Sequence, residues 1–531
     1  MNNNVITCIS YGAFIYMGVW VQEEKRKKIL FLASIVMMLV LVIIGVSDDK
    51  KLLLGMSVIS EAQYQKLTSE LEEVDFDSCL MYEETALPYA TNMYTYMITQ
   101  SMETGNWQGR VFSNNSSAEC YVLDPDMSKN DIIASGAPLK ILVICNDGYK
   151  VENLIVSGLP LIFMSASSAD EENFYGSVKI FENASAGRTG VMDADEYSCR
   201  YRYRGATSLY REKKPYKLNL LNSKGESKKV SLLGMREDND WILNPLSSDQ
   251  TIMREKISYD LWNQMSDVNT HNMEYCELIV DGQYRGVYCL QEPVDVKTYG
   301  TPKSKSYLYS VKQFPLGELY GQLFSDEVVE FLMANDMRVD EYSIDDYAGD
   351  NLEMAIDLLR CMVAKYKGLD YQTDLTVRFD VENSATHDVF INMLQAVDNT
   401  SKNQKLCIYK ENGNEYIITK SPWDMDWVMF HEDYAYAISG PAEIVVDALF
   451  FGDEEEYNNK RKEVYFKARD HFFQEEWLNT TIDNYQELLT RSGAVGRNTA
   501  MWGGDFKVSC DELREFFRVR IPALDEYYGG L

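Results

Sequence analysis

A basic cluster followed by a long apolar run near the N-terminus restricts the architecture of this chain more than any other feature. The cluster is KRKK at residues 25–28, and the apolar run continues from Ile29 to Val46, where Ser47-Asp48-Asp49 ends it. An apolar stretch of this length can cross a bilayer as a helix, and a basic flank stays on the cytoplasmic side. We therefore expect residues 29–47 to form an uncleaved transmembrane signal anchor, which makes the membrane one partner and places the main body outside the cytoplasm. A cleavable signal peptide is the alternative, and residues 1–28 are either cytoplasmic or a non-native extension.

Strand patterns precede helical patterns in the rest of the chain. Residues 48–78 have the pattern of a stalk with an amphipathic helix, and residues 79–155 alternate apolar and polar side chains in short runs, which favours a β-rich module. A hairpin is predicted from Cys276 to Leu290, with its turn at Asp281-Gly282. After about residue 320 we expect helices at 326–333, 355–367, 385–394 and 474–490, and a strand pair at 406–409 and 416–419. The sequence therefore predicts an α+β protein.

Charge and composition exclude several classes of function. The chain has 82 acidic against 51 basic residues, a net charge of −31, whereas proteins that bind nucleic acid need clustered Lys and Arg to neutralise phosphates. Its four His residues form no HExxH pattern and its ten Cys residues show no metal-ligand spacing, so a zinc hydrolase is not expected. We expect no nucleic-acid partner.

The first cluster with chemical potential is a small-residue turn followed by lysines. Arg204, Gly205 and Ser208 lie in the turn RGATS, and Lys214 and Lys217 follow in KKPYKLNL. Such a turn allows backbone amides to approach a phosphate, and a lysine on the next strand can supply a point charge. A solvated basic strand end is the alternative interpretation.

The second cluster is a polar loop, VDNTSKN, that contains Asp398 and Asn403. The D-x-x-x-x-N spacing matches the catalytic loop of protein kinases, in which Asp receives the hydroxyl proton of the substrate and Asn binds a metal ion. A simple Asx-rich loop is the alternative.

The third cluster is SPWDMDW, in which Asp424 and Asp426 follow a predicted strand and Trp423 and Trp427 flank them. Two closely spaced carboxylates at the end of a hairpin can hold a hard cation such as Mg²⁺. A structural Ca²⁺ site or a solvated turn would have a similar sequence, although the tryptophans favour a packed site.

The three clusters occur in the order found in kinases, and together with MREKISYDL and ELIVDGQYRGVYCLQEPV they resemble the CotH kinase family. The resemblance covers roughly residues 155–525. It implies an atypical two-lobed protein-kinase-like fold at 156–525, with an N-lobe at about 156–300 and a C-lobe at about 301–525. It also implies binding of ATP and Mg²⁺ (or Mn²⁺), and phosphorylation of Ser or Thr in spore-coat or cell-surface proteins. The expected substrate is a Ser-rich, basic protein.

The resemblance also assigns residue roles. Asp398 is the catalytic carboxylate, Asn403 and Asp424 are metal ligands that take part in catalysis, and Asp426 is a further metal-binding carboxylate. The implied nucleotide-binding residues are Arg204, Ser208, Lys214 or Lys217, and Glu292 at a nucleotide hinge.

Some features depart from conventional kinases or remain open between two interpretations. No His-Arg pair precedes Asp398 and no Phe-Gly pair follows Asp424, so we do not expect the conventional activation mechanism. Arg254 either supports the site through a carboxylate pair or lies on the surface.

Two alternatives to an enzyme remain: a non-catalytic scaffold for coat or surface assembly, and a cell-wall carbohydrate-binding protein. In each case the expected location is membrane-anchored and extracytoplasmic, or associated with the spore coat.

Overall fold

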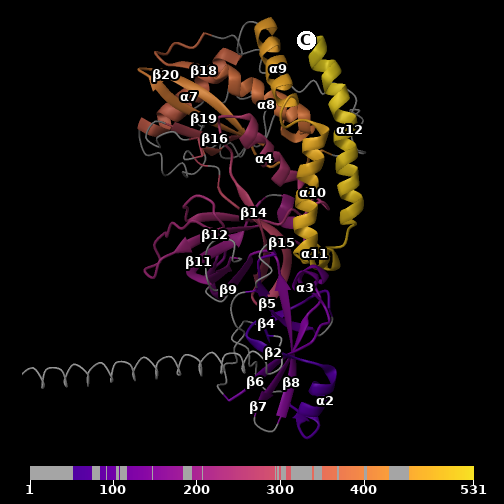
Figure 1. Ribbon diagram of the computed structural model, residues 1–531. Helices are drawn as coiled ribbons and strands as arrows, with labels where there is room; N and C mark the ends of the chain where they lie inside the picture. Colours follow the sequence, from indigo (N-terminus) through magenta and orange to yellow (C-terminus); the bar gives the residue numbers. More distant parts are fainter. Residues whose placement is uncertain are drawn as a thin grey trace, which may run out of the picture.

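The structure, a computed structural model, describes most of the chain after the predicted anchor (Figure 1). The described residues are 52–74, 84–90, 93–102, 107, 117–145, 148–182, 194–205, 207–293, 295, 298–299, 306–311, 338–339, 350–366, 370–399, 403–429 and 454–531. The predicted transmembrane segment at 29–47 and the predicted helix at 326–333 lie outside these residues. Within the described ranges, no helix is long and apolar enough to cross a membrane.

The N-terminal part is a sheet with the strand order β1-β2-β6-β7-β8-β5-β4, and β3 pairs with β8. Its buried face consists of alternate residues such as Tyr96, Val122, Ile141 and Leu154, against which the short helix α3 packs Ile133. The elements are β1 (Leu52–Leu53), β2 (Met56–Ile59), α2 (Glu61–Thr68), β3 (Glu72–Glu73), β4 (Glu84–Ala86), β5 (Tyr94–Thr99), β6 (Glu119–Leu123), α3 (Lys129–Ser135), β7 (Leu139–Cys145) and β8 (Gly148–Ser157).

The next seven strands pair in a ring, β9-β10-β11-β12-β13-β15-β14, which closes through parallel pairing of β14 with β9. Side chains fill the interior of this barrel, as expected for so few strands; the largest of them are Trp241, Tyr201, Tyr216 and Tyr288. The strands are β9 (Leu161–Ala169), β10 (Phe174–Phe181), β11 (Asp195–Tyr203), β12 (Tyr216–Leu221), β13 (Asp240–Asn244), β14 (Met273–Val280) and β15 (Gln283–Gln291). A parallel bridge between Gln283 and Ala86 joins the barrel to the N-terminal sheet.

The predicted hairpin is confirmed as β14 and β15. Asp281 and Gly282 form its two-residue turn, with φ of 49° and 69°. Positive φ at both positions is the requirement of the turn type that matches the twist of paired strands, and an Asp-Gly pair meets it.

One helix, α4 (Arg254–Met265), follows β13 and precedes β14 in the sequence, and it covers the outside of the barrel. The carboxylate of Asp249 stabilises the start of α4, because it accepts hydrogen bonds from the backbone N–H groups of Met253 (2.9 Å) and Arg254 (2.8 Å). The carboxylate of Asp249 also pairs with the guanidinium of Arg254, which is buried. Arg254 is therefore not a surface residue, and its carboxylate pair stabilises the start of α4.

The C-terminal part contains a second sheet, β17-β16-β19-β20-β18, and most of the helices. The predicted strand pair lies in β19 and β20, and the predicted helices at 355–367, 385–394 and 474–490 fall in α7, α8 and α10. The elements are β16 (Ser306–Val311), β17 (Arg338–Val339), α7 (Asp350–Tyr366), β18 (Thr376–Phe379), α8 (Val381–Leu394), η5 (Val397–Asn399), β19 (Gln404–Asn412), β20 (Glu415–Pro422), α9 (Glu454–Arg469), α10 (Glu475–Arg491), α11 (Ala494–Trp502) and α12 (Phe506–Gly530). The prediction of an α+β protein is confirmed.

The C-terminal helices connect all three parts, as Figure 1 shows for α10, α11 and α12 along one side of the molecule. Helix α11 packs on β15 at Gly286, whose φ is +95° and whose Cβ, if present, would lie 2.6 Å from Oδ1 of Asn498. The backbone N–H of Gly158, just after β8, donates to the carbonyl of Ser492 at 3.1 Å. The barrel is therefore held between the N-terminal sheet and the helical part.

Candidate functional site

The carboxylates of the third cluster lie in a turn directly after β20. Asp424 has φ of 60° and is exposed, whereas Asp426 is half-buried. Ser248, from the loop before α4, donates a hydrogen bond to Oδ2 of Asp426 at 2.8 Å. The backbone N–H of Met425 donates to the hydroxyl of Tyr259 in α4 at 3.4 Å. The turn is therefore held against α4 and the loop that leads into it.

The Asp398–Asn403 loop lies directly beside this turn. Asp398 occupies the short 3₁₀ helix η5 that follows α8. The side-chain amide of Asn399 donates to the carbonyls of Asn403 at 3.1 Å and Trp423 at 2.7 Å, and the N–H of Trp423 donates to the carbonyl of Asn403 at 3.1 Å. Asn399 thus joins the second and third clusters. Its place beside Asp398 in the sequence was the only signal of this role.

The charges of the two clusters act on one another. Burial raises the pKa of Asp426, and the negative charge of Asp398 raises it further, while the hydrogen bond from Ser248 and the positive charge of Arg211 oppose the increase. Like-charged carboxylates at close range favour protonation, and a bound cation would relieve their repulsion.

Glu255 in α4 is a further carboxylate of this site that the sequence interpretation did not identify. Burial raises its pKa to about 8, and the negative charges of Asp426 and Asp424 contribute to the increase. Its carboxylate accepts hydrogen bonds from Nδ2 of Asn244 at 2.7 Å and from the hydroxyl of Tyr259 at 3.2 Å. The signal was present in MREKISYDL, where Glu255 follows Arg254 on the helix.

Arg204 is the one residue of the first cluster that the described contacts bring to the carboxylates. Burial lowers the pKa of its guanidinium, and the negative charges of Asp424 and Glu255 oppose this effect. Its Cζ lies 5.7 Å from the centroid of the Trp423 ring. Ser208 lies close to Gly205 in the same turn, because a Cβ on Gly205 would be 2.0 Å from Oγ of Ser208.

The two predicted phosphate-binding lysines have other partners. Nζ of Lys214 donates to the carbonyl of Leu209 in the preceding turn. Lys217 pairs with Asp240 on the neighbouring strand β13, with Nζ 3.7 Å from Oδ2. Neither contact involves the carboxylates of the site.

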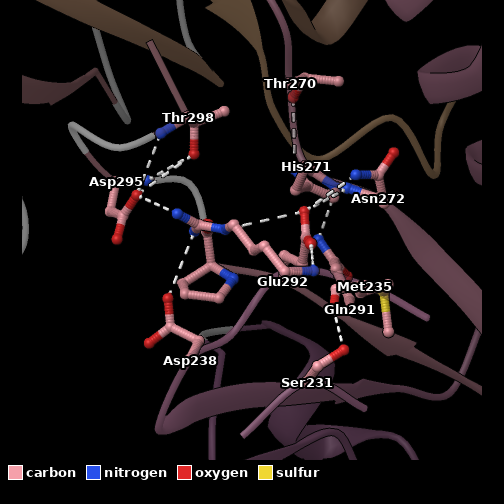
Figure 2. Close-up of polar contacts among 12 residues, drawn as sticks. Ser231, Met235, Asp238, Thr270, His271, Asn272, Gln291, Glu292, Asp295 and Thr298 are labelled. Atoms are coloured by element: carbon pink, nitrogen blue, oxygen red, sulfur yellow. Dashed lines mark hydrogen bonds and ion pairs between the residues drawn. The ribbon is translucent and has the colours of Figure 1, made fainter. Parts of the chain in front are cut away.

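Glu292 lies just past β15 in a buried network (Figure 2). Its carboxylate accepts hydrogen bonds from the backbone N–H groups of Arg236 (2.8 Å) and Asn272 (3.0 Å), and from Nδ2 of Asn272 at 3.1 Å. Arg236 in turn donates to Oδ1 of Asp295 at 2.7 Å. In this structure the carboxylate of Glu292 ties together the segments that enter β14 and leave β15.

The donor atoms of the site suit Mg²⁺, although they do not form a closed cage. Among the described residues, no group of three or more His, Cys, Asp or Glu side chains is arranged to hold a metal ion. Protein sites for Mg²⁺ usually supply one or two carboxylates, and nucleotide phosphates and water complete the coordination. The exposed carboxylate of Asp424, next to the mutually repelling Asp398 and Asp426, fits that kind of open site.

Comparison with known families identifies one match. The model of the family described as CotH kinase protein matches residues 201–524, from the second half of β11 to near the end of α12. A search of curated proteins found no match. The family match includes all three clusters and helix α4, and it begins after the N-terminal sheet, β9 and β10.

Proposed function

Because the chain belongs to the CotH kinase family, we propose that it is an ATP- and Mg²⁺-dependent kinase that phosphorylates Ser or Thr hydroxyls of other proteins. The observation that carries the proposal is the contact between the Asp398–Asn403 loop and the turn of Asp424 and Asp426, made by Asn399. Phosphoryl transfer needs positioning and charge neutralisation more than covalent chemistry, and this pair of loops offers both.

Asp398 is the proposed catalytic carboxylate. It would accept the proton of the attacking hydroxyl and orient that hydroxyl toward the terminal phosphate. The packed helix α8 ends directly before η5 and gives Asp398 a rigid base, since residues 383–394 are all buried. Burial and the charge of Asp398 raise the pKa of the neighbouring Asp426, Ser248 and Arg211 oppose this increase, and a bound metal ion would favour the ionised form.

Asn403, Asp424 and Asp426 are the residues that would hold Mg²⁺. When bound, the metal would neutralise charge on the phosphates and hold them in line with the acceptor hydroxyl. The φ values of Asn403 (56°) and Asp424 (60°) are both left-handed, a conformation that Asn and Asp adopt more readily than most residues. Such local strain is frequent at functional sites.

Arg204 would supply positive charge from the side of the barrel. A guanidinium stays protonated even when burial lowers its pKa, and its planar set of donors suits phosphate oxygens. The barrel with α4 would then act as the nucleotide-binding lobe, and the part with β19, β20 and α8 would act as the catalytic lobe of a two-lobed kinase-like fold.

The substrate and the location are also proposals. A net charge of −31 would attract a basic, Ser-rich substrate, such as a coat or surface protein. The apolar run at residues 29–46 supports a membrane-anchored enzyme whose main body is extracytoplasmic or associated with a spore coat.

Phosphate transfer by the full-length chain in detergent tests the function. The protein is incubated with γ-labelled ATP, Mg²⁺ and a Ser-rich basic protein, and label is followed on both proteins. Removing the catalytic carboxylate in Asp398→Asn should lower turnover by about 10²- to 10⁴-fold. The variant Asp424→Asn should show a comparable loss, and it should need a higher Mg²⁺ concentration for half-maximal transfer, because a charged ligand of the metal is lost.

The matched control is Asp511→Asn, which alters an exposed carboxylate on α12 paired with Arg514. It should leave transfer unchanged. If wild-type protein transfers no phosphate and ATP does not raise its melting temperature, the kinase proposal fails and a non-catalytic scaffold takes its place.

A further inference from the structure

A buried lysine on β19 lies at the site although no sequence pattern assigned it. Lys405 follows Asn403 by two residues and is 7% exposed. Its Nζ lies 4.8 Å from the centroid of the Trp423 ring, the ring that also carries Arg204 at 5.7 Å. Trp423 directly precedes Asp424. Two cations from different parts of the fold, β19 and the end of β11, therefore meet at one aromatic ring beside a proposed metal ligand.

His271 shows that both positive charges reach the same place. Its ring centroid lies 5.4 Å from that of Trp423. Burial lowers the pKa of His271 well below its usual value, and the positive charges of Lys405 and Arg204 lower it further. Nε2 of His271 is 2.7 Å from Nε2 of Gln291 in β15. His271 is therefore a neutral side chain beside Trp423 that feels the positive charges of both Lys405 and Arg204.

Lys405 and Arg204 both bring positive charge to the ring of Trp423. The carboxylate of Asp424 acts on Arg204. A phosphate chain that reaches a metal at Asp424 would pass beside Trp423, because the two residues are adjacent and Mg²⁺ bridges carboxylates to phosphates. A lysine ammonium can only donate hydrogen bonds, so its ligand there must present acceptors, and phosphate oxygens match that requirement.

We propose that Lys405, together with Arg204, binds the phosphate chain of the nucleotide beside Trp423. This inference rests on the proposed kinase function and assigns to Lys405 the part that the sequence placed on Lys214 or Lys217. Those lysines contact Leu209 and Asp240 instead. Strand β19 holds Lys405 rigidly, since it pairs with Ser421 of β20 on one side and with Ser310 of β16 on the other.

Nucleotide affinities of the full-length protein test this assignment. Dissociation constants for ATP, ADP and adenosine are measured with Mg²⁺ by calorimetry for wild type, Lys405→Met and Lys405→Arg. Loss of a charge-assisted contact should weaken ATP binding of Lys405→Met by about 10- to 100-fold. Adenosine affinity should change less than about twofold because adenosine has no phosphate, and Lys405→Arg should recover most of the ATP affinity because it retains the charge.

Lys410→Met is the matched control. Lys410 lies on the same strand with its Nζ 5.9 Å from the ring of Tyr416, so it repeats the lysine–aromatic contact away from the carboxylates. Its ATP affinity should equal that of wild type. The variant Lys217→Met tests the competing assignment, in which Lys217 and not Lys405 determines ATP affinity.

Three results would overturn the assignment. In the first, the ATP affinity of Lys405→Met equals that of wild type. In the second, the adenosine affinity falls as much as the ATP affinity, which would place Lys405 beside the adenine base of the nucleotide. The loss could also occur with a matching loss of thermal stability in both Lys405 variants, which would make its role structural. Wild-type protein that binds ATP and transfers phosphate while Lys405→Met is unaffected refutes only this inference. Wild-type protein that binds no nucleotide refutes the kinase function itself.

Discussion

Arg497 in α11 donates two hydrogen bonds to the carboxylate of Glu277 in β14, from Nε at 2.8 Å and from Nη2 at 2.7 Å. Both side chains are buried, and Ser157 at the end of β8 and Tyr284 in β15 donate their hydroxyls to the same carboxylate. Burial by itself would raise the pKa of Glu277, but the charge and hydrogen bonds of Arg497, together with the hydrogen bonds from Ser157 and Tyr284, lower it. One ion pair thus joins the N-terminal sheet, the barrel and the C-terminal helices.

Removing Arg497 should destabilise the whole assembly. The variant Arg497→Met leaves a buried carboxylate without its counter-charge, which typically costs about 3–5 kcal/mol of unfolding free energy. The double variant Arg497→Met/Glu277→Gln should lose less, because no uncompensated charge remains. Urea unfolding measures both values. Arg491→Met, which breaks an exposed pair with Glu487 on α10, serves as the control and should cost less than about 1 kcal/mol. Equal losses for the buried and exposed pairs would contradict this account.

Lys213 should make stability depend on pH in the alkaline range. Its buried Nζ donates to the carbonyl of Val287 at 2.6 Å and to Oδ1 of Asn498 at 3.0 Å, and burial lowers its pKa to about 7. The amine of a lysine in an unfolded chain has a pKa of about 10.4. At a pH between the folded and the unfolded pKa, the unfolded chain therefore binds a proton that the folded chain has lost. The free energy of unfolding should therefore rise with pH across this window, with a slope of up to about 1.4 kcal/mol per pH unit from this group.

The comparison of wild type with Lys213→Met isolates this effect. The variant lacks the titrating amine, so the difference in unfolding free energy, wild type minus variant, should increase from pH 7 to pH 10 and be constant below pH 7. Lys224→Met, at an exposed lysine after β12, should give a difference that is independent of pH. A constant difference for Lys213→Met would mean that Lys213 stays charged in the folded protein.

Gly205 should be necessary for the turn that holds Arg204. Its φ is +100°, and a Cβ would lie 2.0 Å from Oγ of Ser208, so Gly205→Ala combines backbone strain with a clash. We expect ATP affinity to fall at least about tenfold if displacing the turn removes the contact of Arg204. Gly225→Ala is the control: φ there is +80°, yet no atom lies within 4 Å of the added Cβ, so it tests strain alone. Unchanged ATP affinity in Gly205→Ala would separate this turn from nucleotide binding.

Glu292 should act on stability more than on nucleotide binding. Glu292→Ala removes the acceptor of the backbone N–H groups of Arg236 and Asn272, and each unsatisfied buried donor costs about 1–3 kcal/mol. The melting temperature should fall while the KM for ATP stays within about twofold of wild type. A higher KM at unchanged stability would instead support the nucleotide-hinge role that the family resemblance implies. Steady-state kinetics and thermal unfolding of one preparation distinguish the two outcomes.

Local sequence chemistry determined much of this protein. Short apolar runs predicted the strand pair of β19 and β20, and helical patterns predicted α8 and α10, because the local sequence favours one type of secondary structure over the other. The Asp281-Gly282 pair predicted its hairpin, because few other dipeptides adopt two successive positive φ angles. The D-x-x-x-x-N loop and the PWDMD turn could be recognised in the same way, since both motifs are contiguous in the sequence.

Only the tertiary structure decided how these pieces meet. The barrel closes because residues 277–280 of β14 pair with residues 161–164 of β9, and no local pattern specifies a partner so far away in sequence. Likewise Lys217 and Lys405 both lie on strands, and the sequences of these strands do not show which of the two lysines lies at the site. Pairing of β12 with β13 places Lys217 beside Asp240, whereas pairing of β19 with β20 places Lys405 beside Trp423. The sequence supplies the charges, but strand pairing and burial determine which of them share one site.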